Sequence, residues 1–443
     1  MLTGVNGLNK VRWDSDMKKF FVSVGLIAAG TASLQGAYAP DWNSMSASMW
    51  SVSGTLRGFY DDNYETASSG PNKRSSFGFE VSPQISLDVP LQQTELGLRY
   101  TYGLYYYQDR ENRGQNPIDQ THQFDLWVDH AFTERWQARV QDSFVMGQEP
   151  ELIDPNTSVL TRTEGNNISN TGSLAVNTIW TRLISTAFNY QNSFFDYQNS
   201  GGTAAAPSLA GLMNRIDQSV SLDFEWHVAP ETVTLIGGMF DWVNYVGDEP
   251  IAINPITSAT YYSSSRNSRS YFGYVGVQHS MLANLSFTAK GGVQYSDNYN
   301  DPSGATSLNP YADISLIYTY LPGCYAQAGF TQTRNATDQV SPDPNNGSIA
   351  MSTESSTVYA SINHKLTPKL LGTVIGRWQH SVYNQGSYNN QSDDYYNLGV
   401  NLSYSFNQHF SVDAGYNLDY LTSQIPGYSY TRNRVYLGVA AAY

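Results

Sequence analysis

Short and long connections alternate strictly along this chain, between segments that have the pattern of β-strands. From about residue 49 onward, apolar and polar residues alternate with a period of two in eighteen segments, which is the pattern of β-strands. Eight connections are short, such as 90–93 and 322–323, and nine are long and polar, such as 246–267 and 333–352. A soluble β-sandwich gives no reason for such an alternation of connection lengths.

This alternation predicts a membrane barrel. In an outer-membrane β-barrel, short turns face the periplasm, long loops face outside, and the strand number is even. The segments are also about a dozen residues long, as tilted strands that cross a bilayer must be. We therefore expect an all-β fold, a transmembrane antiparallel up-and-down β-barrel of about eighteen strands. The alternative is a barrel of sixteen strands, because segments 166–197 and 232–245 alternate less clearly.

The first 39 residues have the form of an export signal. A basic start at Met17 precedes a short apolar core at 20–30 and then a run of small residues, which is typical of a secretory signal peptide. We expect an upstream extension plus signal peptide at 1–39, with Met17 as the natural start. Residues 40–48 are then a short periplasmic segment, and residues 49–443 form the barrel.

Composition narrows the class of partner. Charged residues make up only 14% of the chain, against about 25% in a typical soluble domain. Tyr is present 33 times and Gly 36 times, which fits a barrel solvated partly by outer-membrane lipid. The formal net charge of −14 argues against nucleic acid, because phosphate binding needs a basic surface. The single cysteine, Cys324, excludes an internal disulfide.

The sequence contains no catalytic constellation. Its seven His show no metal-ligand spacing, and no nucleophile elbow, phosphate loop or dinucleotide fingerprint occurs. We therefore expect no enzyme activity, no catalytic or metal site and no cofactor. Calcium at the acidic external loops is the alternative, because carboxylates with Asn suit a hard cation. The acidic stretches lie at 61–65 and 149–154.

Closure of a barrel gives each strand a lipid face and a lumen face. Apolar residues take the lipid face, so charged residues of the opposite parity are predicted to line the lumen. An eighteen-stranded barrel is too wide for side chains alone to fill, and we expect its acid excess to disfavour small anions. The pore-lining candidates are Arg57, Glu80, Asp88, Glu95, Arg99, Asp125, Asp129, Arg139, Asp223, Glu225, Lys290, Asp313, Arg377, Asp413 and Arg434.

The third long loop is the candidate for narrowing the pore. It opens with Glu149, Glu151 and Asp154. In general porins the third loop folds inward, and by that analogy these three carboxylates would lie near a constriction.

Three segments resemble one known family of barrels. They are 51–65 (SVSGTLRGFYDDNYE), 75–90 (SSFGFEVSPQISLDVP) and 122–152, in which D-S-F is followed by E-P-E-L. These segments resemble the beta-barrel porin 2 family, whose members are often found with exopolysaccharide export machinery. The match is clear over about 50–152 and is a general barrel likeness beyond. The resemblance implies a conduit for secreted exopolysaccharide in the outer membrane of a Gram-negative-type bacterium. It also implies periplasmic polysaccharide export proteins as partners, and no catalytic residues.

Two other functions stay open from the residues themselves. Walls rich in Tyr, Asn and Gln suit sugars through stacking and hydrogen bonding, but they suit uptake as well as export. The alternatives are a passive diffusion porin for small hydrophilic solutes and a plugged structural or adhesive surface barrel. The sequence gives neither the direction of transport nor the oligomeric state.

The chain ends inside a strand, on RVYLGVAAAY. We expect this strand to close the barrel against the strand that begins near Met49. Its aromatic last residue, with a glycine five positions earlier, resembles the terminal signal that the barrel-assembly machinery reads. The predicted signal residues are Gly438, Ala441 and Tyr443.

Overall fold

The computed structural model describes residues 49–68, 70, 72–147, 167–301 and 304–443. Within these residues, eighteen strands pair into one closed antiparallel sheet, in which β1 (Trp50–Asp61) meets β20 (Tyr430–Ala442). The predicted eighteen-stranded barrel is confirmed, and the two segments of weaker alternation are strands. The predicted signal peptide, segment 40–48 and the carboxylates Glu149, Glu151 and Asp154 lie outside the described residues.

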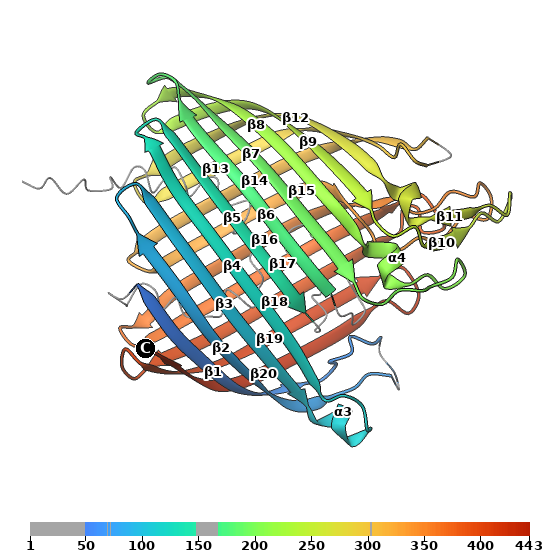
Figure 1. The fold of residues 1–443 in the computed structure, drawn as a ribbon, viewed down its shortest axis with the longest axis horizontal. Helices are drawn as coiled ribbons and strands as arrows, with labels where there is room; N and C mark the ends of the chain where they lie inside the picture. The colour runs from blue at the N-terminus through green and yellow to red at the C-terminus, as the bar shows by residue number, and fades with distance from the viewer. Residues whose placement is uncertain (1–48, 69, 71, 148–166, 302–303) are drawn as a thin grey trace, which may run out of the picture.

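Consecutive barrel strands are neighbours throughout, with β9 followed by β12. Short turns lie at one end of the barrel (left in Figure 1) and long loops at the other, which is the predicted arrangement. The other strands are β2 (Ser76–Pro90), β3 (Thr94–Tyr107), β4 (Ile118–Thr133), β5 (Trp136–Gly147), β6 (Asn167–Ile179), β7 (Ile184–Tyr197), β8 (Arg215–Ala229), β9 (Thr232–Tyr245), β12 (Ser268–Leu282), β13 (Leu285–Asp297), β14 (Thr306–Leu321), β15 (Cys324–Asn335), β16 (Ser352–Thr367), β17 (Leu370–Asn384), β18 (Ser392–Ser405) and β19 (Phe410–Ser423).

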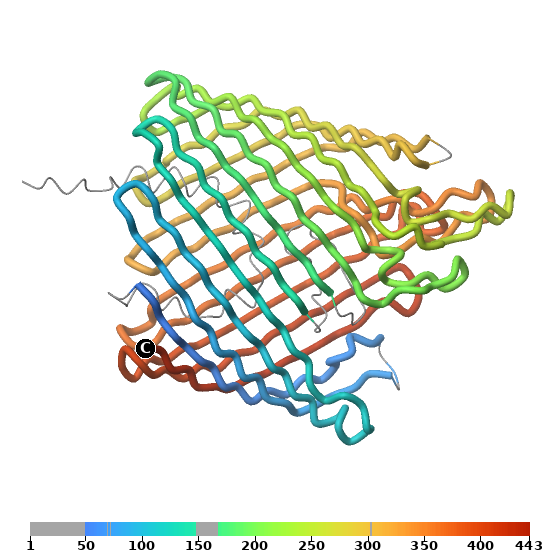
Figure 2. The backbone as a smooth tube through the Cα atoms, in the orientation of Figure 1, coloured from blue at the N-terminus to red at the C-terminus, as the bar shows by residue number. Residues whose placement is uncertain are grey.

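The long loops carry short helices and strands. These elements are too short for sequence periodicity to predict them. Helix α3 (Gln108–Asn112) follows β3, and helix α4 (Leu209–Met213) precedes β8. Between β9 and β12, strands β10 (Pro250–Ile253) and β11 (Thr260–Tyr262) form a hairpin, followed by the 3-10 turn η2 (Ser263–Arg266). This hairpin projects from the long-loop end of the barrel (Figures 1 and 2). No helix among the described residues is long and apolar enough to span a membrane.

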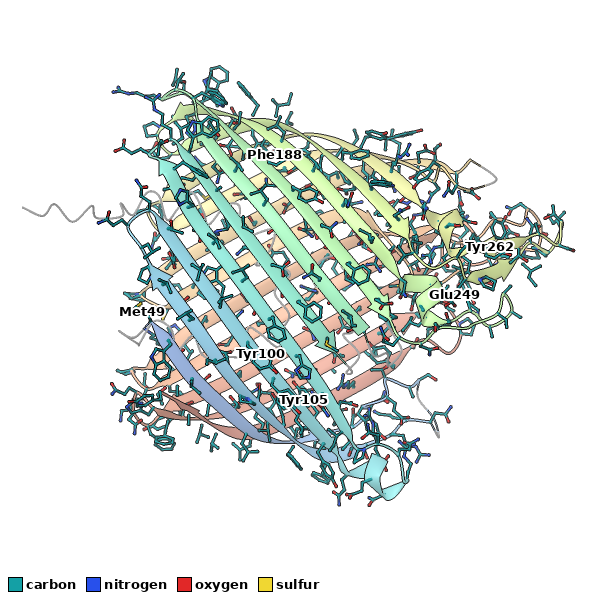
Figure 3. All side chains as sticks on the ribbon, in the orientation of Figure 1. Met49, Tyr100, Tyr105, Phe188, Glu249 and Tyr262 are labelled. Atoms are coloured by element: carbon teal, nitrogen blue, oxygen red, sulfur yellow. The ribbon has the colours of Figure 1, made fainter. Side chains whose placement is uncertain are left out.

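The barrel has an apolar outer face and a polar inner face. On β20, Val435, Leu437 and Val439 are 48%, 63% and 53% exposed, whereas Gly438 and Ala440, at alternate positions, are buried. The same alternation recurs around the barrel, whose side chains point away from the wall on both sides (Figure 3). An exposed apolar face of this extent fits a lipid environment and not water.

The last strand closes the barrel against the first. Backbone hydrogen bonds join Val52 and Tyr443 in both directions, at 3.0 and 2.8 Å. The ring of Tyr443 is exposed and lies 6.2 Å from the ring of Trp50, centroid to centroid. Strand β20 is therefore paired along both edges, by β19 and by β1, which leaves no open edge in lipid. The role of Gly438, Ala441 and Tyr443 as an assembly signal stays a prediction.

Candidate functional site

The register places the charged pore-lining candidates at inward-facing positions. Arg57, for example, follows the exposed Leu56 on β1 and pairs in register with Glu80 on β2 and with Gly438 on β20. The other candidates likewise occupy the parity opposite to the exposed apolar side chains of their strands. The structure thus puts these residues on one continuous inner wall, and their part in conduction stays a prediction.

One ion-pair network crosses the strand that closes the barrel. The Nε of Arg57 lies 2.7 Å from Oδ2 of Asp413, and its Nη1 lies 3.5 Å from Oε1 of Glu80. Asp413 is on β19, so the Arg57 side chain must pass over β20 to reach it. It does so at Gly438, where a Cβ would lie 2.4 Å from Cγ of Arg57. The glycine of the predicted terminal signal therefore also makes room for this network.

Most other charged residues of the inner wall are also compensated by partners on the wall. Glu225 accepts a hydrogen bond from Ser185 at 2.7 Å. Glu95 and Asp313 form no direct ion pair within the described part of the chain, although Asp313 is in register beside Lys290. The remaining direct pairs among the candidates are Arg99–Asp125 (2.9 Å), Arg139–Asp129 (2.5 Å) and Lys290–Asp223 (2.7 Å). Because these side chains pair with one another, the electrostatic field of the inner wall is weaker than its number of acidic residues alone indicates.

The acidic stretch 61–65, considered above for calcium, is neutralised by cations of the chain itself. Burial and a hydrogen bond to Asp109 raise the pKa of Tyr64 within it. No group of three or more potential metal ligands lies together in the residues that the structure describes. The cation partners are Arg432 and Arg434 for Asp61 (2.7 and 3.1 Å), Lys73 for Asp62 (2.9 Å) and Arg113 for Glu65 (2.7 Å).

Several inner-wall aromatic rings lie flat over a glycine of the neighbouring strand. A Cβ at Gly97 would lie 1.9 Å from the ring of Trp127, its register partner on β4. Only glycine permits this contact, which fixes the ring against the wall. The same contact, with the hypothetical Cβ at 2.2–2.3 Å from the ring, is made by Phe59 on Gly78, Tyr274 on Gly237, Tyr359 on Gly329 and Tyr436 on Gly415.

Cations lie over three of these rings. Arg434 lies over Phe59, Lys290 over Tyr274 and Arg57 over Tyr436, at 4.7, 5.1 and 5.1 Å from the ring centroids. Trp127 and Tyr359 are half-buried. Their strands, β4 and β16, stand on nearly opposite sides of the barrel. These two rings therefore present part of their faces to the lumen from facing walls.

Long loops cross a sector of the barrel mouth. Ala336, in the loop after β15, packs against a buried cluster that includes Phe195 of β7 and Met213 of α4. Strands β8, β9, β12, β13 and β14 separate β7 from β15 in the wall. A contact between these loops must therefore span the rim above those strands.

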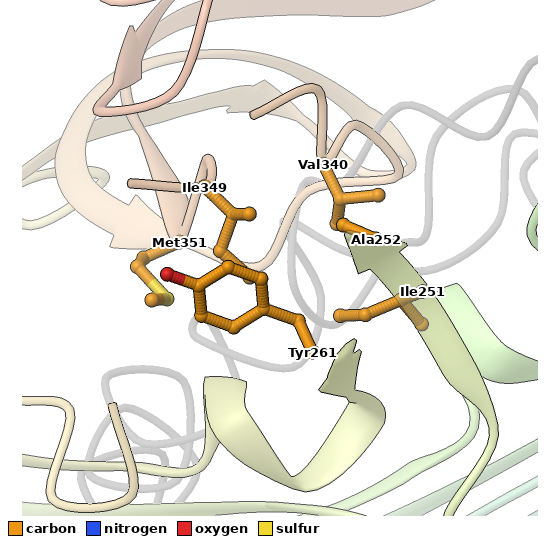
Figure 4. Packing of buried hydrophobic residues seen from close by; sticks show 6 residues of the cluster. All are labelled: Ile251, Ala252, Tyr261, Val340, Ile349 and Met351. Atoms are coloured by element: carbon orange, nitrogen blue, oxygen red, sulfur yellow. The ribbon is translucent and has the colours of Figure 1, made fainter. Parts of the chain in front are cut away.

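A second cluster joins the same loop to the β10–β11 hairpin (Figure 4). We call it the rim cluster. The hydroxyl of Tyr261 donates a hydrogen bond to the carbonyl oxygen of Gly347 at 2.9 Å, which fastens hairpin and loop together. The rim cluster consists of Ile251, Ala252, Tyr261, Val340, Ile349 and Met351.

Arg266 links three loop segments at this rim. Its Nη1 donates to the carbonyl oxygen of Leu212 at 2.9 Å, its Nη2 donates to the carbonyl oxygen of Thr337, and its guanidinium lies 4.6 Å from the ring centroid of Tyr245. The side chain is buried, and this burial lowers its pKa. A guanidinium held by carbonyls and a ring acts as a fixed fastener of the loops.

Sequence reasoning did not find this loop assembly. The third long loop, chosen by analogy, lies outside the described residues. The loops seen to cross the mouth follow β7, β9 and β15. A signal was present, because Ile251, Val340 and Ile349 are large apolar residues inside otherwise polar loops. Large apolar residues in long loops indicate loop–loop packing, but they do not indicate which loops meet.

The comparison with protein families agrees with this geometry. A family model described as "Putative beta-barrel porin 2" matches residues 49–443, the whole of the barrel. The chain belongs to this family. It is therefore an outer-membrane β-barrel of the porin type, as the resemblance in three segments predicted. Family membership extends over the strands for which only a general barrel likeness was visible.

No curated protein sequence matches the chain. Among solved structures, the siderophore receptor PirA from Pseudomonas aeruginosa is similar, with a TM-score of 0.41 and 10% identity over 88% of this chain and 80% of that one. Acinetobacter baumannii OccAB4 gives a TM-score of 0.42 and 12% identity over 89% and 99% of the two chains. Pseudomonas aeruginosa OccK3 gives 0.41 and 11% over 89% and 96%.

Proposed function

We propose that this barrel passes a neutral, hydroxyl-rich exopolysaccharide outward across the outer membrane. The observation that carries the proposal is the pair of flat rings, Trp127 and Tyr359, on facing walls of the lumen. The apolar faces of sugar rings stack on aromatic faces held in this way. A ring pressed onto a glycine is already in position, so stacking costs little side-chain entropy.

The chemistry of the remaining wall supports a neutral cargo. The direct pairs formed by Arg57, Arg99, Arg139 and Lys290 use up much of the wall's charge. What remains available are hydroxyl and amide groups, which exchange hydrogen bonds with sugar hydroxyls as readily as with water. The outward direction, and hand-over from periplasmic export proteins, rest on the resemblance to the family.

Current block by neutral oligosaccharides in planar bilayers tests the binding surface. We expect longer oligosaccharides to block the open channel better than shorter ones, because they reach both rings. Trp127→Ala and Tyr359→Ala should each weaken the block about fivefold, for roughly 1 kcal/mol of lost stacking. Trp226→Ala and Tyr396→Ala are matched controls, because both rings lie exposed on the outer face. A channel that no oligosaccharide blocks would sink the proposal.

Passive diffusion of small hydrophilic solutes is the second candidate, and the loops that cross the mouth favour it. A narrowed rim passes small solutes more easily than a thick polymer. Deletion of the gene in its host separates the two. Loss of surface polysaccharide with periplasmic accumulation supports export. Normal surface polysaccharide together with slower entry of small sugars would instead identify a diffusion porin.

A further inference from the structure

A polar patch interrupts the apolar outer face of the barrel. It consists of Asp142 on β5, Asn170 and Gly172 on β6, and Asn192 on β7, and we call it the outer-face patch. Asp142 lies in the middle of β5 on the same face as Val140 and Met146, which are 41% and 42% exposed. Ser143, the next residue, faces inward and donates to Asp125. The carboxylate of Asp142 is therefore on the lipid side, within the span that crosses the bilayer.

The change from apolar to polar is abrupt along one row of paired residues. Going from β4 to β2, the register partners in this row are Leu126, Leu98 and Leu87. Going the other way, from β5 to β7, they are Asp142, Gly172 and Asn192. A carboxylate on the lipid face of a barrel is unfavourable. Lipid alone gives no reason for this composition on three successive strands.

The patch is partly satisfied within the chain and retains capacity for more bonds. Nδ2 of Asn170 donates to both Oδ1 and Oδ2 of Asp142, each at 3.1 Å. An ionised carboxylate has about four acceptor sites, so the Asp142 carboxylate can accept further donors. Beside it, Gly172 presents no side chain, and a Cβ there would meet only Oδ1 of Asp142, at 3.2 Å. A bare strand next to a hydrogen-bonding pair allows another surface to approach closely.

We propose that the outer-face patch is the contact between two copies of this barrel in the membrane. Two copies with the same orientation in a bilayer are related by a two-fold axis along the membrane normal, and such an interface is self-complementary. With the axis near β6, strand β5 of each copy faces strand β7 of the other. The acceptor Asp142 and the donor Asn192 lie on opposite sides of Gly172. The Asn192 amide of each copy can therefore donate a hydrogen bond to the Asp142 carboxylate of the other. This inference is independent of the transported molecule.

Cysteine cross-linking in outer membranes tests the contact. The chain's own Cys324 is buried, so it does not compete. Gly172→Cys should form covalent dimers with a short bismaleimide, because the two copies of residue 172 lie close to the axis. Gly376→Cys is the matched control, because Gly376 is an outer-face glycine with open space around it, on β17 across the barrel from β6. Folding of both variants is verified by the mobility shift between unboiled and boiled samples. Monomers in both variants, or equal cross-linking in both, would overturn the proposal.

Substitution of the Asp142 carboxylate gives an independent test, because a patch covered by a second copy and a patch covered by lipid predict different results. If a second copy covers the patch, Asp142→Leu should raise the dissociation constant of the dimer about tenfold relative to the wild type, and native mass spectra of nanodiscs should show correspondingly less dimer. If lipid covers the patch, the same variant unfolds at higher temperature and its oligomeric state is unchanged. A cross-linked product of Gly172→Cys that contains a different protein would also refute self-association.

Discussion

The closing seam and the rim cluster hold the barrel together in different ways. The seam consists of β1, β19 and β20, and its charges are compensated by other side chains, as the buried Asp413 is by Arg57 at 2.7 Å. At the rim, Arg266 is held by the carbonyls of Leu212 and Thr337. The seam therefore depends on strand register, which is set along the whole wall. The rim depends on three loops that meet at one point.

This difference predicts how each region fails. A fault in the seam disturbs the pairing of a terminal strand, and because barrel strands unfold cooperatively it lowers the stability of the whole. A fault at the rim releases loops that the wall does not need, so it changes access to the lumen and leaves the barrel folded. The predictions below test this division.

The largest effect is expected at the glycine over which the seam network passes. Gly438→Val places a side chain where a Cβ alone would lie 2.4 Å from Arg57 and 2.7 Å from the carbonyl oxygen of Leu56. Overpacking and loss of the Arg57–Asp413 pair together should lower the free energy of unfolding by about 4 kcal/mol. Urea titration of the refolded barrel in vesicles, followed by tryptophan fluorescence, measures this loss.

The control lies on the same seam but on the other face. Gly54 is an outward glycine of β1 with no atom within 4 Å of a Cβ position, so Gly54→Val should be close to neutral. If both valine variants lose the same stability, the loss comes from glycine content in the seam and not from the space above Gly438.

The second effect is the coupling between the two charges that cross β20. In a double-mutant cycle of Arg57→Met and Asp413→Leu, the double variant should be more stable than the sum of the single losses predicts. We expect a coupling free energy of about 2 kcal/mol, because either single change leaves a poorly solvated charge behind. The same cycle on Arg99 and Asp125, where Arg99 is 41% exposed, should give a smaller coupling.

The two regions also differ in how far the sequence could predict them. The period-two pattern determines which residues share a face, so Arg57 and Asp413 could be assigned to the lumen from their strands alone. Their contact could not, because it needs the register of three strands and the gap at Gly438. The rim was less accessible still. Loop closure has no periodicity, and the packing of Ala336 against the cluster that contains Phe195 joins segments whose strands stand far apart in the wall.

A third effect, confined to the loops, is expected from the rim arginine. Arg266→Met keeps much of the side-chain volume but leaves the carbonyls of Leu212 and Thr337 without this donor, which should destabilise the loop assembly by about 2 kcal/mol. Global unfolding should be unchanged within error, because no barrel strand pairing involves this side chain. The expected readouts are faster proteolysis within 336–351 and a higher single-channel conductance. A lower unfolding midpoint would instead show that the rim and the wall unfold together.

The smallest effect is expected from removal of one hydroxyl group, that of Tyr261, compared with removal of the hydroxyl of the adjacent Tyr262. Tyr261 is 7% exposed and donates to Gly347, whereas Tyr262 beside it is 42% exposed. Tyr261→Phe should weaken the contact between hairpin and loop by about 1 kcal/mol, and Tyr262→Phe should have no effect. Hydrogen exchange of amides in 336–351 should then be about fivefold faster in the first variant only, since local opening sets the exchange rate. Equal exchange in the two variants would mean that apolar packing of the rim cluster, and not this hydrogen bond, holds the loops across the mouth.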